Sequence, residues 1–270
     1  MSGVRIPEVT GSTALFAIVG DPVGQVRSPQ VINALFAQAG ADAILIPLHV
    51  PRDRFVETMR SLMEIRNLQG IVLTVPFKVQ AMSLVTTVLP GALAAGALNA
   101  MRRTATGFWE GDMFDGLGLV RALEEEDTPV AGKRVLLVGT GGAGRAIATA
   151  LARHGAAELD LSDLDQERAE AVAQTVMLAV PACRCSVASP KFAGHDIVVN
   201  ATPLGMQPSD PLPIDLRGIG PEHVLFDIVP KPDVTALMRQ AQKLGVQTIG
   251  GKRMVEAQAR AIAEFFGYRV

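Results

Sequence analysis

The chain has few of the residues that hold small secreted domains or metal centres together. Two of its 270 residues are cysteine and four are histidine, and neither type clusters with metal-ligand spacing. Cys183 and Cys185 lie two positions apart on one face of an expected strand, which is poor disulfide geometry. The sequence therefore predicts two ordinary thiols, no disulfide framework and no metal centre.

Strong net charge and long apolar runs are also lacking. The formal net charge is −2, which predicts no surface for nucleic acid or for membranes. The apolar stretch from Leu84 to Met101 is interrupted by Pro90, Gly91 and Gly96, so it is not expected to span a membrane. No charged-then-apolar leader pattern opens the sequence. Together these properties predict a cytoplasmic protein. Because 49% of the residues are apolar, we also expect a sizeable core.

A glycine-rich turn lies between an expected strand and an expected helix. Val135–Val138 has the pattern of a buried strand, and Gly139, Gly141 and Gly144 follow it with G-x-G-x-x-G spacing. This spacing gives a tight turn, backbone room for a pyrophosphate and close packing of the helix on the strand. Unpaired N–H groups at the helix N-terminus then face the phosphates. Because an expected strand precedes the motif and an expected helix follows it, the motif predicts a dinucleotide site.

An acidic residue after the next strand bears on the choice of dinucleotide. Asp163 follows the expected strand 158–161, where a carboxylate accepts both hydroxyls of an adenosine ribose and repels a 2′-phosphate. NAD is therefore predicted in preference to NADP. The alternative is that Asp163 only ends the strand and caps the following helix, although Asp165 is the better candidate for that cap.

Strands and helices alternate along nearly the whole chain. The expected strands are 14–19, 43–49, 70–75, 134–138, 158–161, 196–200, 224–228 and 247–249, with helices starting at Ser28 and covering 52–65, 77–85 and 252–266. This alternation predicts two α/β domains with a cleft between them. We expect residues 1–115 and 251–270 to form a substrate-binding domain and residues 116–250 to form a Rossmann NAD(P)-binding domain.

Two charged residues stand out in the loops of the first domain. Lys78 follows Thr74–Phe77 at a strand end, where the ligand crevices of open sheets form. Asp115 lies in Gly111–Gly118, where the chain passes toward the cofactor domain. A lysine beside a carboxylate can shuttle a proton to and from a hydroxyl while the cofactor takes a hydride. A solvated surface side chain is the alternative for Lys78.

Eight motifs, in order along essentially the whole chain, resemble the shikimate/quinate dehydrogenase family. They are Gly20–Pro29, Thr74–Lys78, Gly96–Asn99, Gly111–Gly116, Gly139–Gly144, Asn200–Met206, Asp227–Pro232 and Met254–Gln258. The resemblance implies an NAD(P)-dependent dehydrogenase of the kind that serves aromatic amino acid biosynthesis. Its substrate would be shikimate, quinate or a related cyclic hydroxy acid or alcohol. Monomer and homodimer both stay open.

The resemblance also implies roles for individual residues. Lys78 would be the acid/base at the oxidised hydroxyl, with Asp115 as its partner. Substrate contacts would come from Ser28, Thr74, Asn99 and Gln258. The dinucleotide would be lined by Gly139, Gly141, Gly142, Ala143, Gly144, Asp163, Thr202, Ile228, Gly251 and Met254. Arg168 matches an arginine that contacts the 2′-phosphate in NADP-using members, so NADP stays possible.

Five positions that are polar in the family pattern are apolar in this chain. They are Val26, Val72, Met113, Phe114 and Pro230. Removing a partner from a buried polar group costs about 1–3 kcal/mol, so shikimate binding is expected to weaken unless Arg27 meets the carboxylate. Arg27 as a solvated loop residue is the alternative. Our hypothesis is a pocket retuned toward a less polar cyclic alcohol. The alternatives are an ordinary shikimate dehydrogenase that tolerates the changes and an NAD-binding sensor or pseudoenzyme.

Overall fold

The computed structural model describes residues 8–24, 26–192 and 194–269, which form two compact units. The first unit comprises the residues up to Phe114 together with those from Ala259 onward, and the second comprises Asp115–Gln258. The chain returns to the first unit inside helix α8 (Gly251–Phe265), later than the expected position at residue 251. The difference arises because the first half of α8 packs within the second unit, where the Gln258 side chain and the Met254 backbone lie against Gly118.

The first unit is built on a mixed sheet of strand order β2-β1-β3-β5-β6-β4. Its strands are β1 (Ala14–Gly20), β2 (Ala43–His49), β3 (Leu68–Leu73), β4 (Thr87–Val88), β5 (Ala100–Arg103) and β6 (Trp109–Asp112). Its helices are α1 (Ser28–Gln38), α2 (Phe55–Glu64) and α3 (Pro90–Ala95), with the 3₁₀ turns η1 (Arg52–Arg54) and η2 (Gln80–Ser83). Strands β1, β2 and β3 run parallel, whereas β5 runs antiparallel to β3 and β6 antiparallel to β5.

Two features of the first unit differ from the expected alternation. Residues 77–85, expected as a helix, contain only the short turn η2. The reason is that the Lys78 carbonyl oxygen accepts a hydrogen bond from the Leu98 N–H at 2.9 Å, which takes it out of a helical ladder. The hairpin of β5 and β6 is the second difference. Its strands have four residues each, too short for a clear period-two pattern, and its turn depends on Gly107 at φ +86°.

Aromatic side chains from the end of the chain complete the core of the first unit. The ring of Phe16 on β1 stacks on Phe266 at a centroid distance of 4.6 Å and meets the edge of Tyr268 at 5.8 Å. Arg102 on β5 donates to the Phe265 carbonyl oxygen and lies over the Phe265 ring at 4.4 Å. The C-terminal residues therefore belong to this core although the intervening chain forms the other unit.

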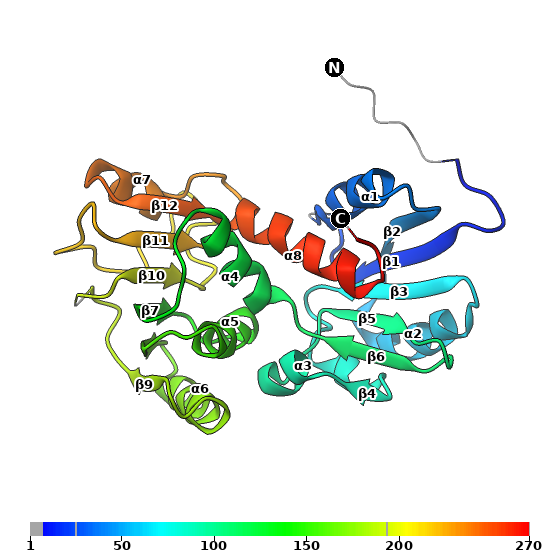
Figure 1. Ribbon diagram of the computed structural model, residues 1–270, viewed down its shortest axis with the longest axis horizontal. Helices are drawn as coiled ribbons and strands as arrows, with labels where there is room; N and C mark the ends of the chain where they lie inside the picture. Colours follow the sequence, from blue (N-terminus) through cyan, green and yellow to red (C-terminus); the bar gives the residue numbers. More distant parts are fainter. Residues whose placement is uncertain (1–7, 25, 193, 270) are drawn as a thin grey trace, which may run out of the picture. The chain divides into compact units, whose positions relative to one another are not determined.

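The second unit is built on a fully parallel sheet of strand order β12-β11-β10-β7-β8-β9, which Figure 1 shows from β9 through β7 to β12. Its strands are β7 (Arg134–Val138), β8 (Glu158–Ser162), β9 (Arg184–Val187), β10 (Ile197–Asn200), β11 (Val224–Asp227) and β12 (Gln247–Gly250). Its helices are α4 (Asp115–Glu125), α5 (Gly142–Arg153), α6 (Gln166–Ala179), α7 (Ala236–Lys243) and the first half of α8.

The parallel sheet is buried on both faces. Val135 and Leu137 of β7 belong to one apolar cluster with residues of α5 and α6, while Leu136 and Val138 belong to another with residues of α7. Successive side chains of a strand point to opposite faces, so this continuous apolar run is typical of a doubly covered parallel sheet. The strand order reverses between β7 and β10, and ligands of such sheets bind outside the carboxyl ends of the strands at that point.

Candidate dinucleotide and substrate sites

The glycine turn after β7 has the geometry that the spacing predicts. Gly139 lies at φ +95°, which a residue with a side chain rarely adopts. A Cβ at Gly144 would collide with the Gly139 carbonyl oxygen, so helix α5 packs directly on the turn. Around Gly141 and Gly142 nothing lies within 4 Å of such a Cβ, and no side chain caps the start of α5. The turn therefore leaves bare backbone N–H groups beside open space, which fits a pyrophosphate.

Asp163 sits just beyond the end of β8 and joins the turn to the following helix. Its Oδ2 accepts hydrogen bonds from the Thr140 N–H at 2.6 Å and the Thr140 hydroxyl at 2.8 Å. Arg168 on α6 donates from Nη2 to Oδ1 at 2.5 Å and from Nε to Oδ2 at 3.3 Å. The sequence analysis did not name Thr140 as a site residue. Its hydroxyl between Gly139 and Gly141 was the feature of the sequence that could have indicated this contact.

These contacts fix the ionisation of Asp163. Burial of the carboxyl opposes its charge, but the Arg168 guanidinium and the N–H and O–H groups of Asp165 and Thr140 outweigh burial and hold the pKa of Asp163 well below its usual range. The expected cap of α6 is confirmed at Asp165, whose Oδ1 accepts from the Arg168 N–H at 3.0 Å. Asp163 is thus a fixed anion rather than a helix cap.

A cavity of about 360 Å³ lies over this edge of the second unit. Its lining residues are Val138, Gly139, Gly141, Ser162, Asp163, Leu164, Arg168, Pro190, Ala201, Thr202, Pro203, Leu204 and Pro213. Four of the expected dinucleotide residues (Gly139, Gly141, Asp163 and Thr202) line it, together with Arg168. Apolar walls beside one charged pair and a bare glycine turn suit a nucleoside joined to a phosphate.

The remaining expected dinucleotide residues lie around the same strand ends. Ala143 is half-buried in the first turn of α5, and Ile228 follows β11 directly. Gly251 begins α8, where a Cβ would collide with the Ile228 carbonyl oxygen, so this position requires glycine. Met254, one turn further along α8, is buried in the core cluster shared with α5 and α6. Met254 therefore contributes to packing in this structure.

The expected substrate residues of the first unit lie at one edge of its sheet. Thr74 follows the end of β3, and the Leu73 N–H donates to the Asn99 carbonyl oxygen at 2.8 Å, just before β5 begins. Ser28 begins α1, after the parallel neighbour β1 has ended at the same edge. Lys78 is half-buried in the turn that follows Thr74. The topology thus gathers these four residues at the carboxyl ends of β1 and β3.

Asp115 and Gln258 form a pair of their own in the second unit. The Gln258 Nε2 donates to the Asp115 Oδ1 at 2.5 Å, and Asp115 is only 4% exposed at the start of α4. In the first unit, the Asn99 side-chain oxygen accepts from the Phe114 N–H at 2.8 Å. The six expected catalytic and substrate residues therefore form two groups, one in each unit.

The five apolar departures lie in different environments. Val72, Met113 and Phe114 are buried in the first unit, and the Phe114 ring packs against Phe265 at a centroid distance of 5.1 Å. Val26 is half-buried beside α1, next to the exposed Arg27, and Pro230 is exposed in the loop after β11. Three of the departures therefore fill core volume, and the structure gives them a packing role.

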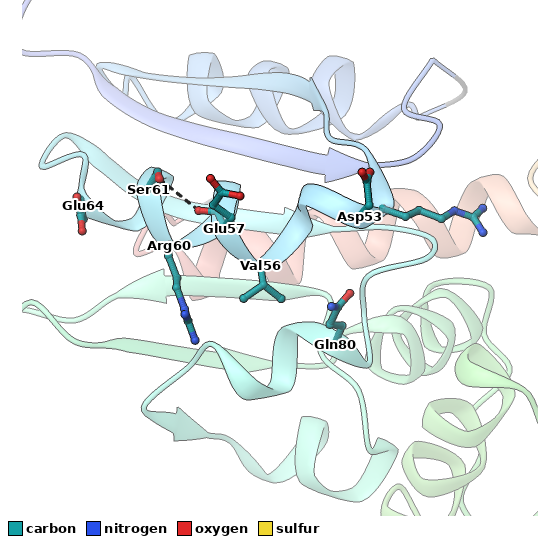
Figure 2. Close-up of a pocket in the computed structure, with 8 residues that line it drawn as sticks. Asp53, Val56, Glu57, Arg60, Ser61, Glu64 and Gln80 are labelled. Atoms are coloured by element: carbon teal, nitrogen blue, oxygen red, sulfur yellow. Dashed lines mark hydrogen bonds between the residues drawn. The ribbon is translucent and has the colours of Figure 1, made fainter.

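Other features of the described residues add no second site. A hollow of about 420 Å³ over α2 and η2 is lined by exposed or half-buried side chains, and Arg60 and Glu64 spread over the helix rather than converge (Figure 2). None of the expected site residues lines it. In the described ranges no three histidine, cysteine, aspartate or glutamate residues group as a metal site. Within those same ranges, no helix is long and apolar enough to cross a membrane.

A parallel sheet with a glycine turn at its switch point defines a Rossmann-type dinucleotide-binding fold, joined here to a mixed α/β unit. Residues 18–101 match the family model described as the shikimate dehydrogenase substrate binding domain. The chain is 33% identical to the shikimate dehydrogenase (NADP(+)) of Symbiobacterium thermophilum, with 96% of this chain and 91% of the relative covered. The chain belongs to the shikimate dehydrogenase family.

Solved structures agree with this assignment. Shikimate 5-dehydrogenase from Listeria monocytogenes, in complex with shikimate and NAD, superposes with a TM-score of 0.89 at 26% identity, covering 97% of this chain and 95% of that one. The ligand-free 5-ketofructose reductase of Gluconobacter sp. strain CHM43 gives a TM-score of 0.87 at 28% identity, covering 96% and 94%. Both likenesses extend over both units, so the expected fold of a substrate domain and a Rossmann domain is confirmed.

Proposed function

We propose that this protein oxidises and reduces a ring hydroxyl of shikimate, quinate or a related cyclic alcohol. The observation that carries the proposal is the retention of a lysine at the end of β3 and a buried carboxylate at the start of α4 in a chain of this family. The nicotinamide ring, when bound, supplies the acceptor for the hydride that leaves the carbinol carbon. The residues of the chain then bind and orient the alcohol and move its proton.

Lys78 is assigned as the acid/base. During oxidation the hydroxyl proton passes to the Lys78 amine while the hydride leaves the same carbinol group, and the two transfers run in reverse during reduction. Asp115 is assigned as its partner, because a carboxylate beside the lysine can accept hydrogen bonds from its amine and hold it in place. The Gln258 side chain orients Asp115 through their 2.5 Å hydrogen bond. Lys78 belongs to the first unit and Asp115 to the second, so the proposal that they act together rests on the family resemblance.

The substrate is assigned as less polar than shikimate at its periphery. Ser28, Thr74 and Asn99 supply hydroxyl and amide groups for its ring substituents, and they lie together at one edge of the first sheet. Val26 stands where the family pattern places a serine for the carboxylate, so a charged substituent loses one partner. A buried or half-buried polar group without its partner costs about 1–3 kcal/mol, which lowers affinity for shikimate by about 5- to 150-fold.

NAD is proposed as the preferred dinucleotide. The anionic Asp163 lies in the wall of the cavity, and Arg168 is held in an ion pair with it. A 2′-phosphate would have to displace Asp163 from Arg168 and would meet the carboxylate at close range, whereas ribose hydroxyls can donate to it. The Symbiobacterium relative is named for NADP(+) and the Listeria structure holds NAD, so both dinucleotides occur among the similar proteins.

A second candidate substrate is a ketone without a carboxylate. The likeness to 5-ketofructose reductase favours it, together with Val26 in place of a carboxylate-binding serine. Reduction of such a ketone needs the same dinucleotide site and the same acid/base. The two candidates differ only in the groups that surround the reacting carbon.

The test is dinucleotide turnover by the pure full-length protein. Shikimate, quinate and 5-ketofructose are offered with NAD(H) and NADP(H) separately, with Lys78→Ala as the control. Turnover that depends on Lys78 supports the proposal, and the substrate with the highest kcat/KM decides between the candidates. Dinucleotide binding without turnover of any substrate would instead favour a sensor or pseudoenzyme. Turnover unchanged in Lys78→Ala would overturn the assignment of the acid/base.

A further inference from the structure

Asp227 is a fully buried carboxylate at the end of β11 that the assigned chemistry does not use. It has no exposed surface and lies in the second unit, where only β10 separates its strand from β7 and the glycine turn. Its Oδ1 accepts from the Asn200 Nδ2 at 2.9 Å and from the Val229 N–H at 3.2 Å, and its Oδ2 accepts from the Thr235 hydroxyl at 2.6 Å. Three donors therefore converge on one buried carboxyl group.

Asn200 connects the Asp227 carboxyl to the loop after β10. Its Nδ2 also donates to the Leu204 carbonyl oxygen at 3.1 Å, while its Oδ1 accepts from the N–H and the hydroxyl of Thr202 at 3.0 and 2.7 Å. Thr202 and Leu204 both line the cavity beside the glycine turn. The orientation of the Asn200 amide is fixed by Asp227, because only an acceptor can face its Nδ2 there.

Thr235 and Val229 connect the same carboxyl to the loop after β11. The Thr235 hydroxyl donates to Asp227 and caps helix α7 by accepting from the Met238 N–H at 3.2 Å. The Val229 N–H is held by the same carboxylate, so the adjacent Ile228 is fixed where its carbonyl oxygen lies against Gly251. One carboxylate therefore fixes both loops at the carboxyl ends of β10 and β11.

We propose that Asp227 is a positioning residue for the dinucleotide, acting through Asn200 on the loop 201–205 and through Thr235 and Val229 on the loop 228–235. The inference rests on the proposed function, since it concerns the same dinucleotide site. The network binds no ligand itself. It sets the shape of the cavity wall that a nicotinamide nucleotide meets, because a satisfied buried network of this kind makes the loops that it joins rigid.

Burial and hydrogen bonding act on the Asp227 carboxyl in opposite directions. Burial raises the pKa of its carboxyl above the usual range, although Thr235, Val229 and Asn200 donate to the charged form. Replacing the carboxylate by an amide, as in Asp227→Asn, turns one acceptor oxygen into an N–H donor. The amide oxygen can still accept from Asn200 and Val229, so the new N–H faces the Thr235 hydroxyl. The bond to Thr235 then reverses its direction, the Thr235 proton loses its acceptor, and the loop 228–235 is held less firmly.

The experiment measures dissociation constants for NAD and NADP by calorimetry on the full chain, at a temperature where every variant is folded. We expect Asp227→Asn to weaken binding of the preferred dinucleotide about tenfold or more, because small misplacements of a binding wall have effects of this size. Asp196→Asn is the matched control. Asp196 makes the same kind of contact at the other end of the sheet, where its Oδ2 accepts from the Arg134 N–H at 2.7 Å, and we expect its affinity to stay within about twofold of wild type.

A second pair of variants keeps the inference testable if Asp227→Asn fails to fold. Thr235→Val removes the hydroxyl that donates to Asp227 and keeps the shape, whereas Thr235→Ser keeps the hydroxyl. We expect weakened dinucleotide binding in Thr235→Val and near wild-type affinity in Thr235→Ser. Equal affinities in both variants, or wild-type affinity in folded Asp227→Asn, overturn the inference alone. A wild-type protein that binds neither dinucleotide overturns the proposed function and the inference with it.

Discussion

The proposed preference for NAD over NADP rests on the Asp163 carboxylate, and Asp163→Asn tests it with almost no change in shape. The Asp163 side chain is 6% exposed and accepts hydrogen bonds from Thr140 and Arg168. An asparagine can still accept one hydrogen bond from Thr140 and one from a ribose hydroxyl. It carries no charge, so Arg168 becomes available to a 2′-phosphate.

The expected magnitude follows from two contributions. A hydrogen bond to a charged group contributes about 1.5–3 kcal/mol and a neutral one about 0.5–1.5, so NAD loses about 1 kcal/mol, or roughly fivefold in kcat/KM. Two like charges about 4 Å apart repel by about 4 kcal/mol at an effective dielectric constant of about 20. Solvent and Arg168 screen about half of that, so NADP gains about 2 kcal/mol, or roughly 30-fold. The ratio of kcat/KM for NAD to kcat/KM for NADP should therefore fall about 150-fold.

The assay compares kcat/KM for NAD and NADP at saturating substrate in wild type and Asp163→Asn. Asp165→Asn is the control, because it removes the same charge from the neighbourhood of Arg168 while asparagine retains the cap of α6. Its ratio is expected to stay within a few-fold of wild type. A ratio that is unchanged in Asp163→Asn, or that falls equally in both variants, would refute the assignment of Asp163 to the ribose.

Three further predictions follow from the same geometry. Lys78→Ala should lower kcat by about 10²–10⁴, the usual contribution of a positioned acid/base, with the dissociation constant for NAD unchanged in calorimetry. Gly144→Ala should destabilise the fold by about 3 kcal/mol in urea unfolding, because its Cβ meets the Gly139 carbonyl oxygen, whereas Gly141→Ala, in open space, should leave stability nearly unchanged and weaken dinucleotide binding. Because the folded pKa of Asp163 is lowered, its charge stabilises the fold fully above about pH 4 and this stability is lost as the pH falls further. The Tm difference between wild type and Asp163→Asn should therefore be constant above about pH 5 and shrink as the pH is lowered from about 4 toward 2, and a difference that stays constant below pH 4 would contradict the ionised carboxylate.

Local sequence pattern sufficed for most of the second unit. Its central strands β7, β10 and β11 are buried apolar runs, and five of its six strands were predicted to within one residue, whereas the exposed edge strand β9 was missed. The pattern was less informative in the first unit. The β5–β6 hairpin is short and antiparallel, and the stretch after Lys78 loses its helix to a hydrogen bond with Leu98, which is distant in sequence.

The sequence by itself determined the glycine turn, the parallel sheet, the family and the identity of the expected site residues, because each depends on residue types at short spacing. Only the tertiary structure decided how those residues are held. Asp163 is paired with Arg168 and Thr140, and Met254 lies in the core. The Asp227 network is also a tertiary feature: it joins Asn200, Thr235 and Val229, up to 35 positions apart, and such contacts exist only once parallel strands place their carboxyl ends side by side.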